Sequence, residues 1–342
     1  MDIEKSLKKL REVNITVLPD FYLDILINPN MSYEKLMKEF DEVYKRGGGN
    51  LLGPKTQIVS GGNGGNVAIT LGGLGVNAAF ISNSSEFGKT LIEFYMHPYG
   101  VRTYISPTGE TAISLIFEIP HGTTKHNVML CSAGTVANFS SELLIDEQWK
   151  VLKESDVVAI TNAQNLEMED LVETILSEIL PNTNVSIDFS DLTPHIQRID
   201  GFRKRVLEHP TKPPTYIFGN ENEVRLLAKS EDNSPEAALR KLSLEYPEII
   251  FGCHMARKAE IWQGGDQLAL EPCFSIEILK ATGAGDFWHA GYLVGDQLDL
   301  SIPETVSFAN AVAGYQISTG KIATLKEIID FINSSSRYES SR

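Results

Sequence analysis

The stretch KATGAGDFWHAGYLV, residues 280–294, decides how we interpret this chain. Thr282 and two glycines precede an apolar run that has the character of a helix. The backbone N–H groups at the start of a helix have no partner inside it and point outward, so they bind oxyanions. We therefore expect Gly283, Ala284 and Gly285 to form an anion-binding nest.

Asp286 lies in the first turn of this predicted helix. A carboxylate beside an anion site is electrostatically unfavourable, so its presence there indicates a functional role. One such role is to accept the proton of an attacking hydroxyl. The alternative role is that of an ordinary helix N-cap, which aspartate commonly fills. The residues alone leave both roles open.

A second glycine cluster, SGGNGGNVAITLGGLG, spans residues 60–75, follows a strand-like QIV and opens into a helix. Glycines let a backbone approach a ligand closely, and the two asparagines supply uncharged donors and acceptors. A polyhydroxy ligand needs that mixture, although a tight turn with close helix packing explains the glycines equally well. The candidate ligand-binding residues are Gly61, Gly62, Asn63 and Asn66. The cluster does not have the context of a dinucleotide-binding Gly-x-Gly-x-x-Gly.

Composition excludes several classes of function. The 30 basic and 45 acidic residues give a net charge of −15, so the chain lacks the basic field that binds nucleic acid or an anionic membrane. Three widely spaced cysteines argue against a disulfide framework and a structural zinc site. No apolar run is long enough to span a membrane, and the charged N-terminus lacks the core of a signal peptide. We expect a cytoplasmic protein without nucleic-acid or membrane partners.

Strand-like and helix-like segments alternate along most of the chain. Apolar runs at 14–19, 77–82, 112–119, 156–161, 184–189, 215–219 and 248–252 are separated in several places by helical patterns, one of them at 165–180. This alternation predicts an α/β fold with a mostly parallel sheet and helices on both faces. Two segments, 25–60 and 101–130, do not follow this alternation, and we expect them to form a small β-rich lid. The first contains a predicted helix that Ser32 caps. Residues 1–24, 61–100 and 131–342 would then form the main domain.

The two glycine clusters, in this order and about 220 residues apart, resemble the paired motifs of the ribokinase-like, or PfkB-type, carbohydrate kinases. The family's Gly-Gly-x-x-x-Asn is matched by residues 61–66, and its Thr-Gly-Ala-Gly-Asp by residues 282–286. The resemblance covers roughly residues 14–325. It implies a three-layer ribokinase-like fold with a lid, and a kinase that transfers the γ-phosphoryl group of ATP to a hydroxyl of a small sugar or polyol. It also implies a homodimer formed through the lid.

The resemblance implies roles for the residues that match. Asp286 would be the general base, and residues 283–285 would stabilise the transferred phosphoryl group. Asp24, with Asp20 as a lesser candidate, would grip the hydroxyls of the acceptor beside the 61–66 motif.

On the nucleotide side, residues 220–223 resemble the family's Asn-x-x-Glu, which places Glu223 at Mg²⁺ and Asn220 at the nucleotide. Further residues assigned to the nucleotide site by the resemblance are Thr282, Gly252, Asn310 and Lys280.

The chain departs from the family pattern in three places. Lys280 stands where an aspartate beside a monovalent-cation site is usual, so we hypothesise that activity needs no potassium. The family's Thr-x-Gly-x-x-Gly turn is replaced by FGCHMAR, residues 251–257, which leaves ATP and ADP both open as donors. Asn63 stands where lysine is frequent, which favours a neutral acceptor, although Arg102 and Lys55 are available as a phosphate clamp. A nucleoside kinase of this fold and a non-catalytic sugar or nucleotide sensor remain alternatives.

Overall fold

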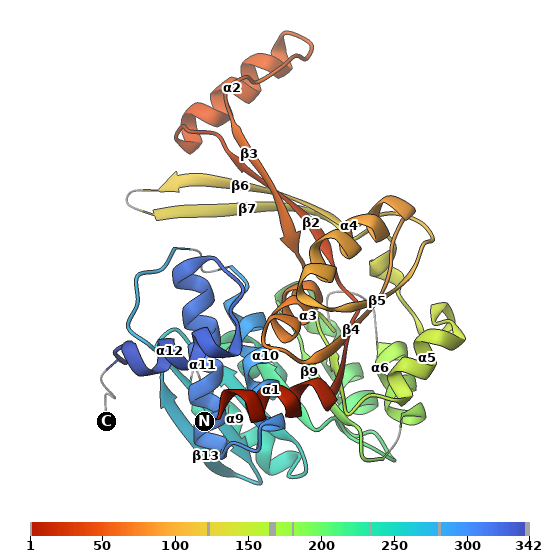
Figure 1. Ribbon diagram of the computed structural model, residues 1–342. Coiled ribbons are helices and arrows are strands. Elements are labelled where there is room, and N and C mark those ends of the chain that lie inside the picture. The colour runs from red at the N-terminus through yellow and green to blue at the C-terminus, as the bar shows by residue number, and fades with distance from the viewer. Residues whose placement is uncertain are drawn as a thin grey trace.

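The computed structural model describes residues 2–121, 124–163, 169–179, 181–232, 234–279 and 282–338. Its larger sheet follows the order β13-β12-β11-β10-β9-β8-β1-β4-β5 (Figure 1). The strands from β11 to β5 run parallel, and β12 and β13 are antiparallel. The predicted mostly parallel sheet is therefore confirmed. The strands are β1 (Asn14–Leu18), β4 (Asn77–Asn83), β5 (Arg102–Ser106), β8 (Val157–Ile160), β9 (Asn184–Asp188), β10 (Tyr216–Gly219), β11 (Ile250–His254), β12 (Lys258–Gln263) and β13 (Asp266–Pro272).

Helices cover both faces of this sheet because its strands are apolar on both sides. In β8, Val157 and Ala159 join one hydrophobic core, and Val158 and Ile160 join the other. The first face carries α1 (Ile3–Glu12), α3 (Asn63–Gly73), α4 (Glu86–Met96), α10 (Ala284–Gln297), α11 (Ile302–Thr319) and α12 (Leu325–Ser334). The second carries α5 (Asp146–Lys153), α6 (Glu169–Glu178), α7 (Ile199–Phe202), α8 (Glu221–Ala228) and α9 (Pro235–Glu245). The predicted three-layer arrangement is confirmed.

Short helical segments connect these layers. They are η1 (His97–Tyr99), η2 (Gly134–Asn138), η3 (Ser141–Leu143), η4 (Thr193–Arg198) and the π-helical turn η5 (Arg203–Leu207). Within the described ranges, none of the helices combines the length and the apolar character that a membrane span requires.

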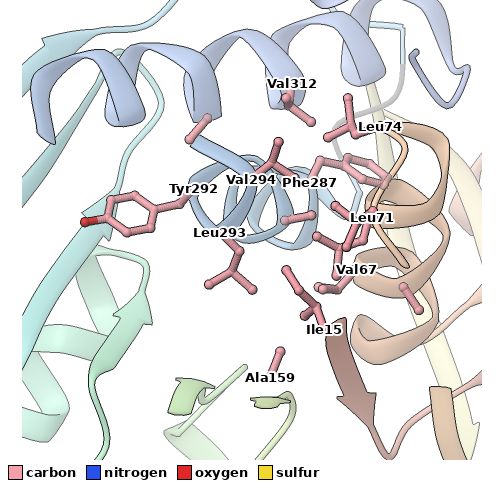
Figure 2. Close-up of a cluster of buried hydrophobic side chains, with 14 of the residues drawn as sticks. Ile15, Val67, Leu71, Leu74, Ala159, Phe287, Tyr292, Leu293, Val294 and Val312 are labelled. Carbon is pink, nitrogen blue, oxygen red and sulfur yellow. The ribbon is translucent and has the colours of Figure 1, made fainter. Parts of the chain in front are cut away.

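The packing of α10 sets the position of the site. Figure 2 shows Phe287 of α10 beside Leu71 of α3, with Val312 of α11 above α10. These side chains are buried, so α10 is held firmly between its two neighbours. The glycine-rich starts of α3 and α10 are thereby brought together.

A second, smaller sheet stands apart from the main body (Figure 1). Its order is β3-β2-β6-β7, formed by β2 (Tyr22–Asn28), β3 (Lys55–Gly61), β6 (Ile113–His121) and β7 (Thr124–Ser132). Between β2 and β3 lies α2 (Tyr33–Lys45), at the far end of the sheet in Figure 1. The side chain of Ser32 accepts a hydrogen bond from the Lys35 amide at 3.4 Å, which confirms the predicted cap.

The small sheet differs from the predicted lid at its boundaries. The segment 101–130 was assigned to the lid, but β5 pairs with β4 in the large sheet. The physical reason is that Ile105 of β5 is buried in the first core, which fixes this strand to the main body. The small sheet also begins at Tyr22, slightly before the predicted boundary at residue 25.

Candidate functional site

The carboxyl ends of the parallel strands meet at one edge of the large sheet, which is where ligands bind in open α/β folds. A cavity of about 540 Å³ lies at this edge, lined by both sheets. Strand ends and the segments after them contribute Asn162, Asp188, Ser190, Asn220 and His254, and the small sheet contributes Tyr22, Asp24, Ser114, Met129 and Cys131. The remaining lining comes mainly from the starts of α3 and α10, and from Glu223 and His195.

The start of α10 has the geometry of an anion-binding site. Its first intrahelical hydrogen bond runs from the Phe287 amide to the Gly283 carbonyl at 3.1 Å, so the amides of residues 284–286 have no partner inside the helix. Gly283 has a φ of 85°, a left-handed conformation that glycine adopts without strain. Thr282, Gly283 and Gly285 line the cavity. The helix start thus offers free amides at residues 284–286, one residue further along than the predicted nest, and anion binding there stays a prediction.

Asp286 faces the cavity and does not cap its own helix. The N-cap position belongs to Gly283, and no side chain caps α10. The carboxylate instead accepts a hydrogen bond from Asn66 Nδ2 at 2.8 Å. Burial raises the pKa of Asp286 well above the ordinary aspartate value, and the charge of Asp188 raises it further. Hydrogen bonds from Asn66 and Asn63 act in the opposite direction.

The two carboxylates predicted to bind the acceptor substrate, Asp24 and Asp20, lie in different surroundings. Asp20 is fully buried and accepts hydrogen bonds from the amides of Asn63 at 2.7 Å and Gly64 at 3.0 Å, and from Thr161 Oγ1 at 2.6 Å. It therefore caps α3 and does not line the cavity.

Asp24 does line the cavity, together with Gly62, Asn63 and Asn66. Gly61 lies behind it, and a Cβ on Gly61 would overlap the Asp24 carboxylate. Four of the five residues predicted to bind the acceptor substrate are therefore at the cavity surface. The fifth, Gly61, leaves room for the Asp24 carboxylate.

Asn220 and Glu223 form a reciprocal cap at the start of α8. Asn220 Oδ1 accepts from the Glu223 amide at 3.1 Å, and Glu223 Oε2 accepts from the Asn220 amide at 2.8 Å. Both side chains line the cavity. Burial raises the pKa of Glu223, and the charges of Asp191 and Asp286 raise it further.

Asp188 is a cavity residue that the sequence interpretation missed. It ends β9, and its Oδ1 accepts a hydrogen bond from the Ser190 amide at 3.0 Å. Burial raises the pKa of Asp188, and so does the charge of Glu223. Its position as an acidic residue at the end of the strand-like run at 184–189 is the signal that identifies it.

The carboxylates Asp188, Glu223 and Asp286 concentrate negative charge in one buried place. A divalent cation would relieve this charge, and carboxylate oxygens are the ligands that Mg²⁺ prefers. In the part of the chain that the structure describes, no three acidic, His or Cys side chains lie close enough to hold a metal directly. Glu223 and Asp188 are the residues that would hold Mg²⁺, through water.

Three predicted nucleotide or nest residues lie away from the cavity surface, and a fourth falls outside the structure. Gly252 packs in the interior, where a Cβ would come within 2.6 Å of Phe218 Cδ1. Asn310 is buried and accepts a hydrogen bond from Trp288 Nε1 at 2.9 Å. Ala284 contributes its amide to the helix start but does not line the cavity. Lys280, with the potassium hypothesis attached to it, lies outside the described residues.

The proposed phosphate clamp does not form. Arg102 lies on β5 in a separate surface pocket with Tyr104 and Glu147. Lys55 is exposed at the start of β3 and does not line the cavity.

A family model and a curated relative match most of the chain. Residues 28–327 match the family model of the pfkB family carbohydrate kinases. The chain is 21% identical over 306 residues to ribokinase from Haemophilus influenzae, covering 84% of this chain and 92% of that protein.

Two solved structures share its fold. One is the adenosine kinase of Sinorhizobium meliloti, with a TM-score of 0.71, 19% identity, and coverage of 91% of this chain and 94% of that one. The other is Arabidopsis thaliana ribokinase complexed with ribose and ATP, with a TM-score of 0.70, 15% identity, and coverage of 94% and 98%. Since the family model spans most of the sequence and the paired glycine clusters meet in one cavity, this chain belongs to the pfkB family of carbohydrate kinases and is a phosphotransferase with a hydroxyl acceptor.

Proposed function

We propose that the protein transfers the γ-phosphoryl group of ATP to a hydroxyl group of a neutral sugar or polyol. The observation that carries this proposal is the pairing of Asp286 with Asn66 beside the free amides of α10. A proton acceptor and an oxyanion site thus lie side by side, which is the combination that in-line phosphoryl transfer needs.

Asp286 acts as the general base in this scheme. Its carboxylate accepts the proton of the attacking hydroxyl while Asn66 holds it in a fixed orientation. Burial and the charge of Asp188 raise the pKa of Asp286, which makes its carboxylate a stronger proton acceptor. The amides of residues 284–286 and the positive end of α10 stabilise the charge on the transferred group.

Glu223 and Asp188 would hold Mg²⁺ through water. The ion, when bound, neutralises the charge of the nucleotide phosphates. Asn220 fixes the position of Glu223 through the reciprocal cap, with Asn220 Nδ2 donating to Glu223 Oε1 at 2.6 Å. The ribokinase structure from Arabidopsis contains ATP and thus supports ATP as the donor here.

The charge of the cavity supports a neutral acceptor. Among the described residues that line it there is no lysine or arginine, whereas Asp24, Asp188, Glu223 and Asp286 all do so. An acceptor that already carried a phosphate would bring its negative charge into this acidic cavity without a cation to pair with. Hydroxyl groups, in contrast, pair well with carboxylate and amide groups such as Asp24 and Asn63.

A nucleoside is the second candidate acceptor. Tyr22 and Met129 of the small sheet line the cavity and offer an apolar surface against which a base would pack. A nucleoside is also neutral, so charge does not distinguish it from a sugar.

An acceptor panel tests the proposal. Purified protein is given Mg²⁺ and either ATP or ADP with neutral sugars, polyols, nucleosides and sugar phosphates, and nucleotide consumption and the phosphorylated product are measured. We expect turnover with a neutral acceptor. Turnover confined to sugar phosphates, or nucleotide binding without any turnover, would contradict the proposal.

A further inference from the structure

His289 connects α10 to the middle of the large sheet. Its Nε2 lies 2.6 Å from Ser186 Oγ of β9, and both residues are completely buried. The ring also packs against Phe218 of β10 in a T-shaped arrangement, with 5.2 Å between the ring centroids. The imidazole is therefore fixed on two neighbouring strands, one helical turn beyond Asp286.

A histidine is an unfavourable residue for this position if packing alone matters. Burial lowers the pKa of His289 to about 3, so the ring is neutral near pH 7. Ser186 pairs with Nε2, whereas in the part of the chain that the structure describes nothing pairs with Nδ1. An unpaired polar atom in the core lowers stability, and an apolar side chain would fill this space without that loss. The contact with Ser186 therefore explains the histidine better than core packing does.

The contact lies next to the carboxylates of the cavity. Ser186 and Asp188 are two residues apart on β9, so their side chains point to the same face of the strand. Asp286 and His289 are three residues apart on α10 and share one face of the helix. The Ser186–His289 hydrogen bond is thus one step along strand and helix from Asp188 and Asp286, which both line the cavity.

The start of α10 needs a contact of this kind. The charges of Asp188 and Asp286 repel each other, which favours separation of the helix start from β9. Apolar contacts oppose the separation, but they are non-directional and permit small shifts of the helix. A buried hydrogen bond depends on both distance and angle, so it sets the position of the helix on the strand.

We infer that His289 is a positioning residue, whose hydrogen bond with Ser186 fixes the first turn of α10 against β9 and so places the Asp286 carboxylate for proton transfer. The inference rests on the proposed function, since it takes Asp286 to be the general base. His289 does not line the cavity, so it acts through Asp286 and not on the substrate.

Four variants and a control test the inference. Ser186→Ala and His289→Leu each remove the hydrogen bond, and the double variant Ser186→Ala/His289→Leu removes both partners. His289→Gln keeps a side-chain amide that can pair with Ser186. Ser177→Ala is the matched control, because it deletes a serine hydroxyl 3.1 Å from His209 Nε2, away from the cavity. Kinetics with the acceptor found in the panel give kcat, and thermal unfolding gives the Tm.

We expect kcat to fall about tenfold in Ser186→Ala, in His289→Leu and in the double variant, because the base shifts relative to the attacking hydroxyl. His289→Gln should stay within about threefold of the unaltered protein, and Ser177→Ala within about twofold. The double variant leaves neither partner unpaired, so its Tm should lie within about 3 °C of that of the unaltered protein. The loss of kcat would then be separate from any loss of stability.

An Asp286→Asn background shows whether the effect passes through the base. If His289 acts by placing Asp286, His289→Leu should lower kcat less than about twofold in that background, because the group that it positions no longer accepts the proton.

A kcat of the double variant within twofold of that of the unaltered protein would overturn the inference. So would a tenfold fall caused by His289→Leu in the Asp286→Asn background, because that result marks a general effect on the fold. Either result, obtained with an unaltered protein that turns over, leaves the proposed function intact. If the unaltered protein phosphorylates no acceptor, the proposed function fails and this inference fails with it.

Discussion

Asn66 Nδ2 donates a 2.8 Å hydrogen bond to Asp286 Oδ2, joining two residues that are 220 positions apart in the sequence. Asn66 lies in the first turns of α3, and Asp286 lies in the first turn of α10. The bond therefore links the glycine cluster on the acceptor side to the one on the phosphate side. Each helix start contributes one partner, so the relative position of the two helices sets the geometry of the proposed base.

Removing this bond should slow phosphoryl transfer without disturbing nucleotide binding. We expect Asn66→Ala to lower kcat about tenfold to a hundredfold, because the Asp286 carboxylate loses the group that orients it. Asn77→Ala is the control, since Asn77 makes a comparable 2.7 Å hydrogen bond to Asn14 that lies outside the cavity. A kcat for Asn66→Ala within twofold of the unaltered protein would show that the bond has no part in turnover.

Asp20 should matter for stability more than an ordinary helix cap does. Asp20→Ala leaves the half-buried amide of Asn63, the buried amide of Gly64 and the Thr161 hydroxyl without their acceptor, so we expect a loss of about 3 kcal/mol in the free energy of unfolding. Asp2→Ala removes the exposed cap of α1, where the side chain accepts from the Lys5 amide at 3.2 Å, and should cost about 0.5–1 kcal/mol. Urea denaturation measures both. Equal losses of unfolding free energy in Asp20→Ala and Asp2→Ala would mean that Asp20 acts only as a helix cap.

Gly61 should be required for the position of Asp24. A methyl group at Gly61 would overlap the Asp24 carboxylate and push it from its place in the cavity. We expect Gly61→Ala to raise the acceptor KM about tenfold and to leave the KM for ATP within twofold. Gly201→Ala is the control, because nothing lies within 4 Å of a Cβ there. A parallel rise in both KM values would instead indicate a general distortion of the site.

Asp188 should make the protein less stable as the pH rises. Its pKa is raised in the folded state, mainly by burial, above the value of about 3.9 for an unfolded aspartate. Between these values the folded state binds more protons than the unfolded state, so stability falls as the pH increases.

Asp188→Asn cannot ionise and should lose this dependence. We expect its Tm to exceed that of the unaltered protein by about 2 °C or more at pH 8, and by less at pH 5. Thermal unfolding across that range measures the difference, with Asp266→Asn, an exposed substitution of the same charge, as the control. Parallel curves for Asp188→Asn and the unaltered protein would contradict this explanation.

The sequence predicted best what depends on local residue types. The alternation of strands and helices gave the parallel sheet, and the glycines at 61–66 and 282–286 gave the two helix starts. Backbone requirements of this kind can be read from neighbouring residues.

The sequence was less informative where distant contacts decide the outcome. Asn310 resembles a nucleotide-binding residue, but its oxygen is satisfied by Trp288, a partner that only the packing of α10 on α11 supplies. Likewise, β5 joins the large sheet because of its pairing with β4. Asp188 ends a strand-like run but belongs to no motif, and its contact with the other carboxylates of the cavity becomes visible only when the strand ends are brought together.

The central claim is that Asp286 is the base of a phosphoryl transfer, and Asp286→Asn tests it most directly. The variant keeps a polar side chain of the same size beside Asn66 but cannot accept a proton. With the best acceptor from the panel, kcat should fall at least about a hundredfold, while calorimetry should give a Kd for ADP within about threefold of that of the unaltered protein. A kcat within tenfold of that of the unaltered protein would contradict the claim.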